Sequence, residues 1–139
     1  MPTHLRELLR RDGILVIPAV YDALSAKIAE RLGFKAVGLG GFLVAASRLG
    51  LPDVGYLTMS EMVEAVRAMA GAVGIPLLAD GDTGYGNPLN VRRTVQEYEA
   101  GGPSPPPHAE PAGGLERAHR REHGPLTFIL SPPEGERAG

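Results

Sequence analysis

Two aspartates placed two residues apart, Asp80 and Asp82, are the best candidates for chemistry in this sequence. They open the glycine-rich segment at residues 80–87 (DGDTGYGN), directly after the apolar run at 77–79 (LLA). In an extended segment, side chains at positions i and i+2 point in the same direction. Two converging carboxylates repel each other unless a cation or a proton lies between them, and oxygen ligands favour Mg²⁺ or Mn²⁺. We therefore expect Asp80 and Asp82 to bind a divalent metal, although spacing alone also allows one carboxylate to cap the turn and the other to be solvated.

Three short apolar runs predict strands near residues 14–18, 36–40 and 76–80, each followed by a helix, with a longer loop after the second strand. The first run is continuous, which is typical of a strand buried on both faces of a parallel sheet. The alternation of a strand and a helix occurs three times, and this pattern indicates either an open doubly wound sheet or part of an eightfold α/β barrel. In both folds the functional groups lie at the carboxyl ends of the strands. The acidic residues expected there are Asp22, Asp53, Asp80 and Asp82.

The helices are marked by capping residues and apolar stripes. Asp22 is expected to cap the helix after the first strand. Thr58 and Glu61 form a capping box for a helix that should end at Gly74, and Asn90 is expected to cap a fourth helix that runs to about residue 100. The expected core-facing stripes are Leu24, Ile28 and Leu32 in the first of these helices and Met62, Val66, Met69 and Val73 in the second.

Composition narrows the class of protein. The chain has 139 residues, of which 43% are hydrophobic and 22% charged, and this balance fits one small globular domain. Its formal charge of −2 gives no field that would attract nucleic acid or an anionic membrane. Cysteine is absent, which excludes disulfides, thiolate metal ligands and a cysteine nucleophile. No apolar run approaches the roughly 18 residues of a membrane helix, so the sequence predicts a cytoplasmic protein.

The character of the chain changes after residue 101. Residues 102–139 hold eight of the thirteen prolines and only five Leu, Ile, Val or Phe residues. Such a segment buries too little apolar surface to offset the entropy of ordering it. We therefore divide the chain into a partial barrel at 1–101 and a low-complexity, disordered tail at 102–139, and we expect no strand at 128–130 to join the sheet.

Three segments carry a family resemblance: residues 18–24 (PAVYDAL), 49–53 (LGLPD) and 80–87 (DGDTGYGN). In this order they closely resemble the isocitrate lyase / phosphoenolpyruvate mutase superfamily over about residues 5–101. Methylisocitrate lyases, carboxyphosphonoenolpyruvate mutases and oxaloacetate decarboxylases look like the nearer relatives. The resemblance implies an α/β fold that is the N-terminal part of a (β/α)₈ TIM-type barrel.

The resemblance also implies a chemistry. Family members cleave or form a C–C or P–C bond of an α-oxo-acid or a 2-hydroxy tricarboxylate through a pyruvate enolate, which Mg²⁺ stabilises as a Lewis acid. By position, Asp80 resembles the direct Mg²⁺ ligand, Asp82 a ligand through water, and Asp53 a catalytic group near the transferred moiety. The residues that fall where family members bind the substrate carboxylate through backbone N–H groups are Gly40, Gly41 and Phe42.

The sequence departs from the family after Gly101. Relatives continue into a strand with the motif His-Ile-Glu-Asp, whose Glu helps to organise the metal, and into a Lys-Cys-Gly-His type loop whose Cys is the acid-base of the lyases; neither motif is present. We therefore expect a catalytically incomplete protein. The alternative is a truncated or frame-shifted noncatalytic fragment that acts, if at all, as a binding or interaction module. The homo-oligomers that the family implies are in question for this chain.

Overall fold

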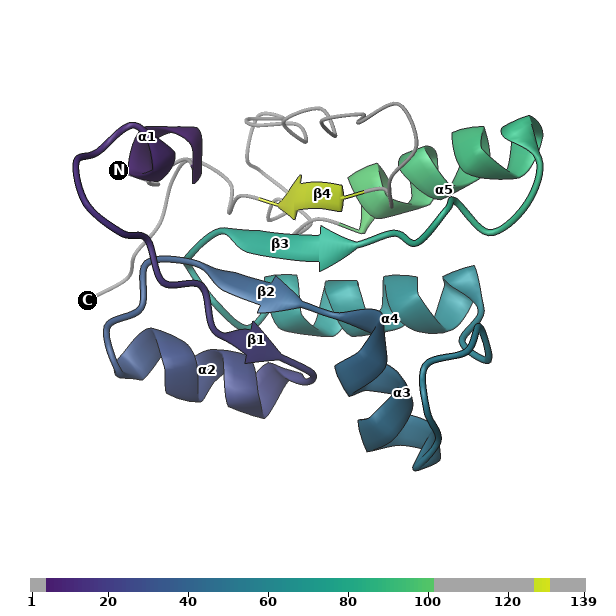
Figure 1. The fold of residues 1–139 in the computed structure, drawn as a ribbon, viewed down its shortest axis with the longest axis horizontal. Helices are drawn as coiled ribbons and strands as arrows, with labels where there is room; N and C mark the ends of the chain where they lie inside the picture. The colour runs from purple at the N-terminus through teal and green to yellow at the C-terminus, as the bar shows by residue number, and fades with distance from the viewer. Residues whose placement is uncertain (1–4, 102–126, 131–139) are drawn as a thin grey trace, which may run out of the picture.

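The computed structural model describes residues 5–101 and 127–130, which build one four-stranded sheet with the order β1-β2-β3-β4. Neighbouring strands β1, β2 and β3 are parallel, and β4 runs antiparallel to β3 (Figure 1). The strands are β1 (Ala19–Val20), β2 (Val37–Leu39), β3 (Leu77–Asp80) and β4 (Thr127–Leu130).

Helices connect the parallel strands. None of the helices in the described part of the chain combines the length and apolar character needed to cross a membrane. They are α1 (Leu5–Leu9), α2 (Ala23–Arg31), α3 (Gly41–Leu49), α4 (Met59–Ala70) and α5 (Pro88–Ala100).

The two faces of the sheet have different partners. Leu39 of β2 and Leu77 of β3 are buried in the main core with residues of α2, α3, α4 and α5. On the other face, Leu78 packs with Leu5 and Leu8 of α1. Strands β1, β2 and β3 follow one another in chain order and the helices that connect them share one core, whereas a doubly wound sheet reverses its strand order and carries its connecting helices on both faces. The arrangement is that of consecutive units of a barrel.

Several sequence predictions are confirmed. The first three strands are parallel, and Asp22 and Thr58 are the N-caps of α2 and α4, each in a capping box. The four residues predicted as the apolar stripe of α4 are all buried, although the last of them lies beyond the end of the helix: Met62, Val66, Met69 and Val73.

The prediction of the first strand is wrong. Hydrogen bonding to β2 begins only where the Gly38 N–H donates to the Pro18 carbonyl, at 2.9 Å, so the strand is Ala19–Val20 and the preceding apolar run lies outside the sheet. Ile14 is 94% exposed as a result.

The predicted core face of α2 is also wrong. Its large apolar residues lie in solvent, whereas Ala26 and Ala29 are buried because small side chains let the helix lie close to the sheet. The exposed residues are Leu24, Ile28 and Leu32.

Helix boundaries account for three further corrections. A helix, α3, begins directly after β2 where a long loop is predicted. Helix α4 ends at Ala70, and its C-cap is Gly71 rather than Gly74. Asn87, not Asn90, is the N-cap of α5, because its side chain accepts hydrogen bonds from the first turn and Pro88 supplies the fixed φ suited to the first helical position.

Strand β4 corrects the prediction that residues 128–130 stay apart from the sheet. Its backbone pairs with β3, with Thr127 opposite Asp80 and Leu130 opposite Leu77. The edge of β3 offers unpaired backbone groups, and a Thr-Phe-Ile-Leu segment has high strand propensity. The rest of the predicted tail lies outside the described residues.

Candidate functional site

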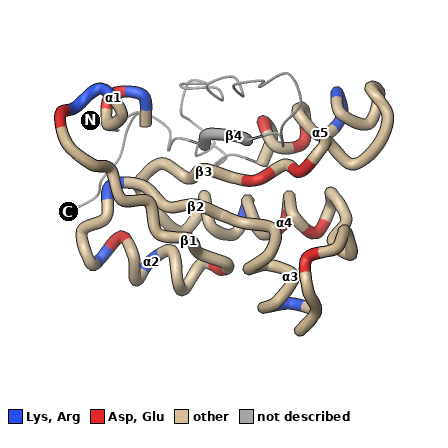
Figure 2. The backbone as a smooth tube through the Cα atoms, viewed as in Figure 1, with Lys and Arg blue, Asp and Glu red and all other residues tan. Residues whose placement is uncertain are grey.

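The predicted site residues come from three separate segments at the carboxyl ends of β2 and β3. Asp80 is the last residue of β3, and Asp82 lies in the loop that follows it. Gly41 is the first residue of α3, directly after β2, and Asp53 lies in the segment between α3 and α4. Figure 2 shows acidic residues gathered where β3 ends.

The carboxylates of Asp53 and Asp80 converge on Gly41. A Cβ atom placed on Gly41 would lie 3.4 Å from Asp53 Oδ2 and 3.7 Å from Asp80 Oδ2. The missing side chain of Gly41 therefore leaves a space that two carboxylate oxygens face. Because oxygen is the ligand atom that Mg²⁺ and Mn²⁺ prefer, this space has the chemistry of a hard-cation site.

The two oxygens of Asp80 are used differently. Oδ1 accepts a hydrogen bond from the backbone N–H of Asp82, at 2.9 Å, while Oδ2 faces Gly41. Asp80 therefore does cap the turn, as the alternative interpretation of the sequence supposed. It still directs its second oxygen toward the space that it shares with Asp53, so capping and cation binding are compatible.

Asp82 lies in an electrostatically unfavourable position. Its burial, and then the charges of Asp80 and Asp53, raise the pKa of its carboxyl above the usual range. Asp53, Asp80 and Asp82 therefore lie close enough for their charges to interact. The sequence prediction that they share one end of the sheet agrees with this geometry.

The loop after β3 has an unusual backbone. Asp82 and Tyr85 adopt positive φ angles of 49° and 60°, and Gly84 and Gly86 also have positive φ. For residues other than glycine, such conformations cost about 1–3 kcal/mol each and persist only when surrounding structure enforces them. The Gly84 N–H donates to the Gly81 carbonyl at 3.0 Å, which closes a tight turn around Asp82.

Two buried tyrosines belong to this region, Tyr85 within the loop and Tyr98 on α5. The Tyr98 hydroxyl donates to the backbone carbonyl of Asp80 at 2.8 Å, and burial raises the pKa of Tyr98 to about 12. Burial likewise raises the pKa of Tyr85, with the nearby Tyr98 adding to the effect. The Tyr85 hydroxyl is buried and has no hydrogen-bond partner of good geometry among the described residues, although Tyr98 and Asp82 lie near it.

The predicted carboxylate-binding residues form the N-terminus of α3. Gly40 is the N-cap, and its carbonyl accepts from Leu43 and Val44. Because the first N–H groups of a helix have no acceptor within it, those of Gly41 and Phe42 are suited to an anion. The Phe42 side chain is 60% exposed and does not contribute to the core.

An open hollow of ≈ 380 Å³ leads along the sheet to this site. Its walls are mainly apolar, and it reaches the polar site at Asp80 and Gly40. The lining residues are Ile17, Ala19, Gly38, Leu39, Gly40, Leu78, Ala79 and Asp80.

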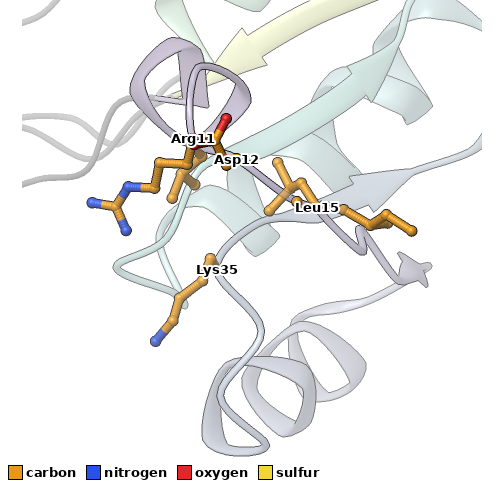
Figure 3. A pocket seen from close by; sticks show the side chains of 7 residues that line it. Arg11, Asp12, Leu15 and Lys35 are labelled. Carbon is orange, nitrogen blue, oxygen red and sulfur yellow. The ribbon is translucent and has the colours of Figure 1, made fainter.

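A second hollow, of ≈ 160 Å³, lies at the opposite, amino-terminal ends of the strands (Figure 3). Figure 3 shows the charged ends of Arg11 and Lys35 well separated, so they do not converge as the carboxylates do. The remaining lining residues are Leu8, Asp12, Gly13, Ile14 and Leu15.

Within residues 5–101 and 127–130, no three or more His, Cys, Asp or Glu side chains are arranged to hold a metal ion by themselves. A cation at Asp80 would therefore take other ligands from water or substrate, as Mg²⁺ commonly does. Neither Thr94 nor the hydrogen-bonding role of Tyr98 was predicted from the sequence. Their four-residue spacing on α5 was the available signal, but it indicates packing as readily as hydrogen bonding.

Comparison with known proteins gives the family. Residues 5–104 match phosphoenolpyruvate phosphomutase, so the chain belongs to this family within the PEP mutase/isocitrate lyase superfamily. It is 52% identical over 98 residues to 2,3-dimethylmalate lyase of Eubacterium barkeri, covering 70% of this chain and 34% of the relative. It is 47% identical over 98 residues to oxaloacetate decarboxylase of Rhodopseudomonas palustris, with the same two coverages.

A solved structure of phosphonopyruvate hydrolase in complex with oxalate and Mg²⁺ superposes with a TM-score of 0.66 and 42% identity, covering 71% of this chain and 35% of that one. The fold is thus the N-terminal part of a TIM-type barrel, and the relatives named here are a lyase, a decarboxylase and a hydrolase of small carboxylic acids. The chain spans about a third of the length of the relatives it matches.

Proposed function

We propose that residues 5–101 carry the metal- and carboxylate-binding part of a family lyase or mutase, one that cleaves or forms a C–C or P–C bond through a pyruvate enolate. The observation that carries this proposal is the convergence of the Asp53 and Asp80 carboxylates on the space in front of Gly41. The lyase and mutase relatives favour this function over that of a noncatalytic interaction module.

The residues present fit a magnesium ion. In this proposal Asp80 holds Mg²⁺, or Mn²⁺, directly and Asp82 holds it through water, while Asp53 lies beside the transferred group. When bound, the ion supplies Lewis-acid stabilisation of negative charge on an enolate oxygen. Support comes from the carboxylate oxygens around Gly41 and from the Mg²⁺ and oxalate in the phosphonopyruvate hydrolase structure.

The substrate in this proposal is a small α-oxo- or 2-hydroxy-carboxylic acid. The N–H groups of Gly40, Gly41 and Phe42 receive its carboxylate at the N-terminus of α3, where the helix dipole favours an anion. The hollow along the sheet leaves the other end of the molecule against apolar residues.

Weak turnover is a further part of the proposal. The sequence has no cysteine to serve as the lyase acid-base, and it lacks the His-Ile-Glu-Asp motif. Binding of metal and carboxylate is therefore the property most directly testable in this chain. The cytoplasmic location and the oligomeric state remain predictions.

Isothermal titration of the purified chain with MgCl₂ and oxalate tests the proposal. We expect oxalate binding to require Mg²⁺, and Asp80→Asn to weaken it by at least about tenfold, the scale on which even outer-shell changes act. Asp12→Asn, at the opposite end of the strands, is the charge-matched control and should bind as the parent does. Equal binding by Asp80→Asn and Asp12→Asn would contradict the proposed site.

A further inference from the structure

Helix α5 presents a polar stripe to the loop that carries the carboxylates. Asn90, Thr94 and Tyr98 recur every four residues and so lie on one face of the helix. Thr94 and Tyr98 are fully buried, each 0% exposed. The Thr94 hydroxyl lies 2.9 Å from the Gly84 carbonyl, and the Tyr98 hydroxyl lies 2.8 Å from the Asp80 carbonyl. Both hydroxyls thus reach backbone atoms of residues 80–84.

Thr94 does not need this contact to satisfy its hydroxyl. Its oxygen also lies 3.0 Å from the Asn90 carbonyl one turn earlier, which is the usual acceptor for a threonine within a helix. An apolar residue of the same shape would fill the position equally well. The contact with Gly84 therefore points to a role in the loop rather than in packing alone.

The loop needs such support because its backbone is strained. The positive φ angles of Asp82 and Tyr85 flank Gly84, whose carbonyl faces Thr94. The bond from the Asp82 N–H to Asp80 Oδ1 makes the direction of the Asp80 carboxylate depend on the path of this backbone. A shift of the Gly84 or the Asp80 carbonyl would therefore change the directions of the Asp80 and Asp82 carboxylates.

We propose that Thr94 and Tyr98 are positioning residues that set the directions of the Asp80 and Asp82 carboxylates by holding the carbonyls of Gly84 and Asp80. This inference rests on the proposed function for its consequence, metal binding. Its geometric part, the ordering of the loop, can be measured without a metal.

Two shape-conserving variants test the inference, Thr94→Val and Tyr98→Phe. The first readout is the hydrogen exchange of the Asp82 and Gly84 amides by NMR without metal, because both amides donate within the loop. The second is the Mg²⁺ dissociation constant in the presence of oxalate. We expect both variants to exchange these two amides roughly tenfold faster relative to the amides of α2, the scale of one lost hydrogen bond. We also expect both variants to bind Mg²⁺ roughly tenfold more weakly.

Two controls separate positioning from general stability. Thr94→Ser keeps the hydroxyl and should restore both readouts to within about threefold of the parent, well inside the tenfold effect. Thr58→Ala removes a helix cap away from the loop, so it should lower the melting temperature while leaving both loop readouts unchanged.

Unchanged amide exchange in folded Thr94→Val and Tyr98→Phe overturns the inference, and so does faster exchange with unchanged Mg²⁺ affinity. If the parent chain binds no Mg²⁺, the proposed function fails, and amide exchange alone then decides whether the two hydroxyls order the loop. Should Tyr98→Phe fail to fold, the Thr94→Val and Thr94→Ser pair gives the decision.

Discussion

Asp53 and Asp80 face one space in front of Gly41, although the first lies in the segment between two helices and the second ends a strand. The glycine makes the arrangement possible, since any side chain would begin between the two carboxylates. Gly41 has no positive φ that would itself demand glycine. Glycine is needed here because it leaves the space between the two carboxylates open. A substitution at Gly41 is therefore a sensitive test of the site.

Gly41→Ala should keep the fold and lose the cation. The added methyl would lie in ordinary contact with Asp53 Oδ2 and Asp80 Oδ2, so no backbone shift is required. Alanine is favoured over glycine in a helix, and stability should stay the same or rise by up to about 1 kcal/mol. Mg²⁺ affinity in the presence of oxalate should fall by at least about tenfold because the methyl occupies the space.

Thermal unfolding and isothermal titration on the same preparation check this prediction. A folded Gly41→Ala protein that binds Mg²⁺ as the parent does would show that the ion is held elsewhere. A loss of both stability and binding would show that the glycine is required by the backbone instead.

The cap of α2 should make the protein sensitive to acid. The Ser25 N–H donates to Asp22 Oδ1 at 2.7 Å, and this bond lowers the pKa of the Asp22 carboxyl. A lowered folded-state pKa contributes stability above the unfolded value of about 3.9, and this contribution is lost as pH falls through the folded value. Asp22→Asn keeps a capping side chain but cannot titrate.

Denaturant unfolding of both proteins between pH 7 and pH 2.5 measures this contribution. At pH 7 the two should differ by less than about 1 kcal/mol, because asparagine and aspartate are comparable caps. Below pH 4 the parent should lose more stability than Asp22→Asn. Parallel pH curves would show that another carboxyl accounts for the acid sensitivity.

The order of parallel strands and helices could be predicted from the sequence because its signals are local. The Thr58–Glu61 capping box and the buried stripe of α4 are each contained within a few turns of chain. The first strand was misplaced because apolar residues at 14–17 form a strand only where β2 is available to pair with them. Pairing begins at Pro18, and that depends on the approach of a distant segment.

Residues of the candidate site could be singled out from the sequence, but the contacts that support them could not. Asp80 and Asp82 are marked by their position after an apolar strand, and Asp53 by the family motif. One oxygen of Asp80 accepts a hydrogen bond and the other faces Gly41 because of the turn that contains Asp82 and Gly84. Residue spacing alone does not specify that turn. Strand β4 could not be predicted because its pairing depends on the open edge of β3.

Loss of the hydroxyl should affect the stability of the protein differently at Tyr98 of α5 and at Tyr85 of the loop. Tyr98→Phe removes a hydrogen bond and leaves the Asp80 carbonyl without that donor, at a cost of about 1–3 kcal/mol. Tyr85→Phe removes a buried hydroxyl that has no hydrogen-bond partner among the described residues, so stability should be unchanged or slightly higher. Urea unfolding of the two variants is the measurement, each serving as the other's control. Equal destabilisation would mean that the Tyr85 hydroxyl is hydrogen-bonded in solution.

The purified chain should show little or no turnover of oxaloacetate, methylisocitrate or isocitrate, even with Mg²⁺ present. Because the chain has no cysteine to serve as the acid-base, proton transfer should lose about 10²- to 10⁴-fold in rate. The hollow leading to Asp80 is open, so water is not excluded and electrostatic stabilisation of an enolate is screened.

A coupled assay for pyruvate or glyoxylate release, run beside Asp80→Asn, separates the possible outcomes. Background rates that are equal in the parent and in Asp80→Asn agree with a site that binds but does not turn over. Turnover that falls with Asp80→Asn but not with Asp12→Asn would show that this chain is a working enzyme. We would then look for the acid-base group at or near Asp53, because the Asp53 carboxylate faces the same space in front of Gly41 as Asp80.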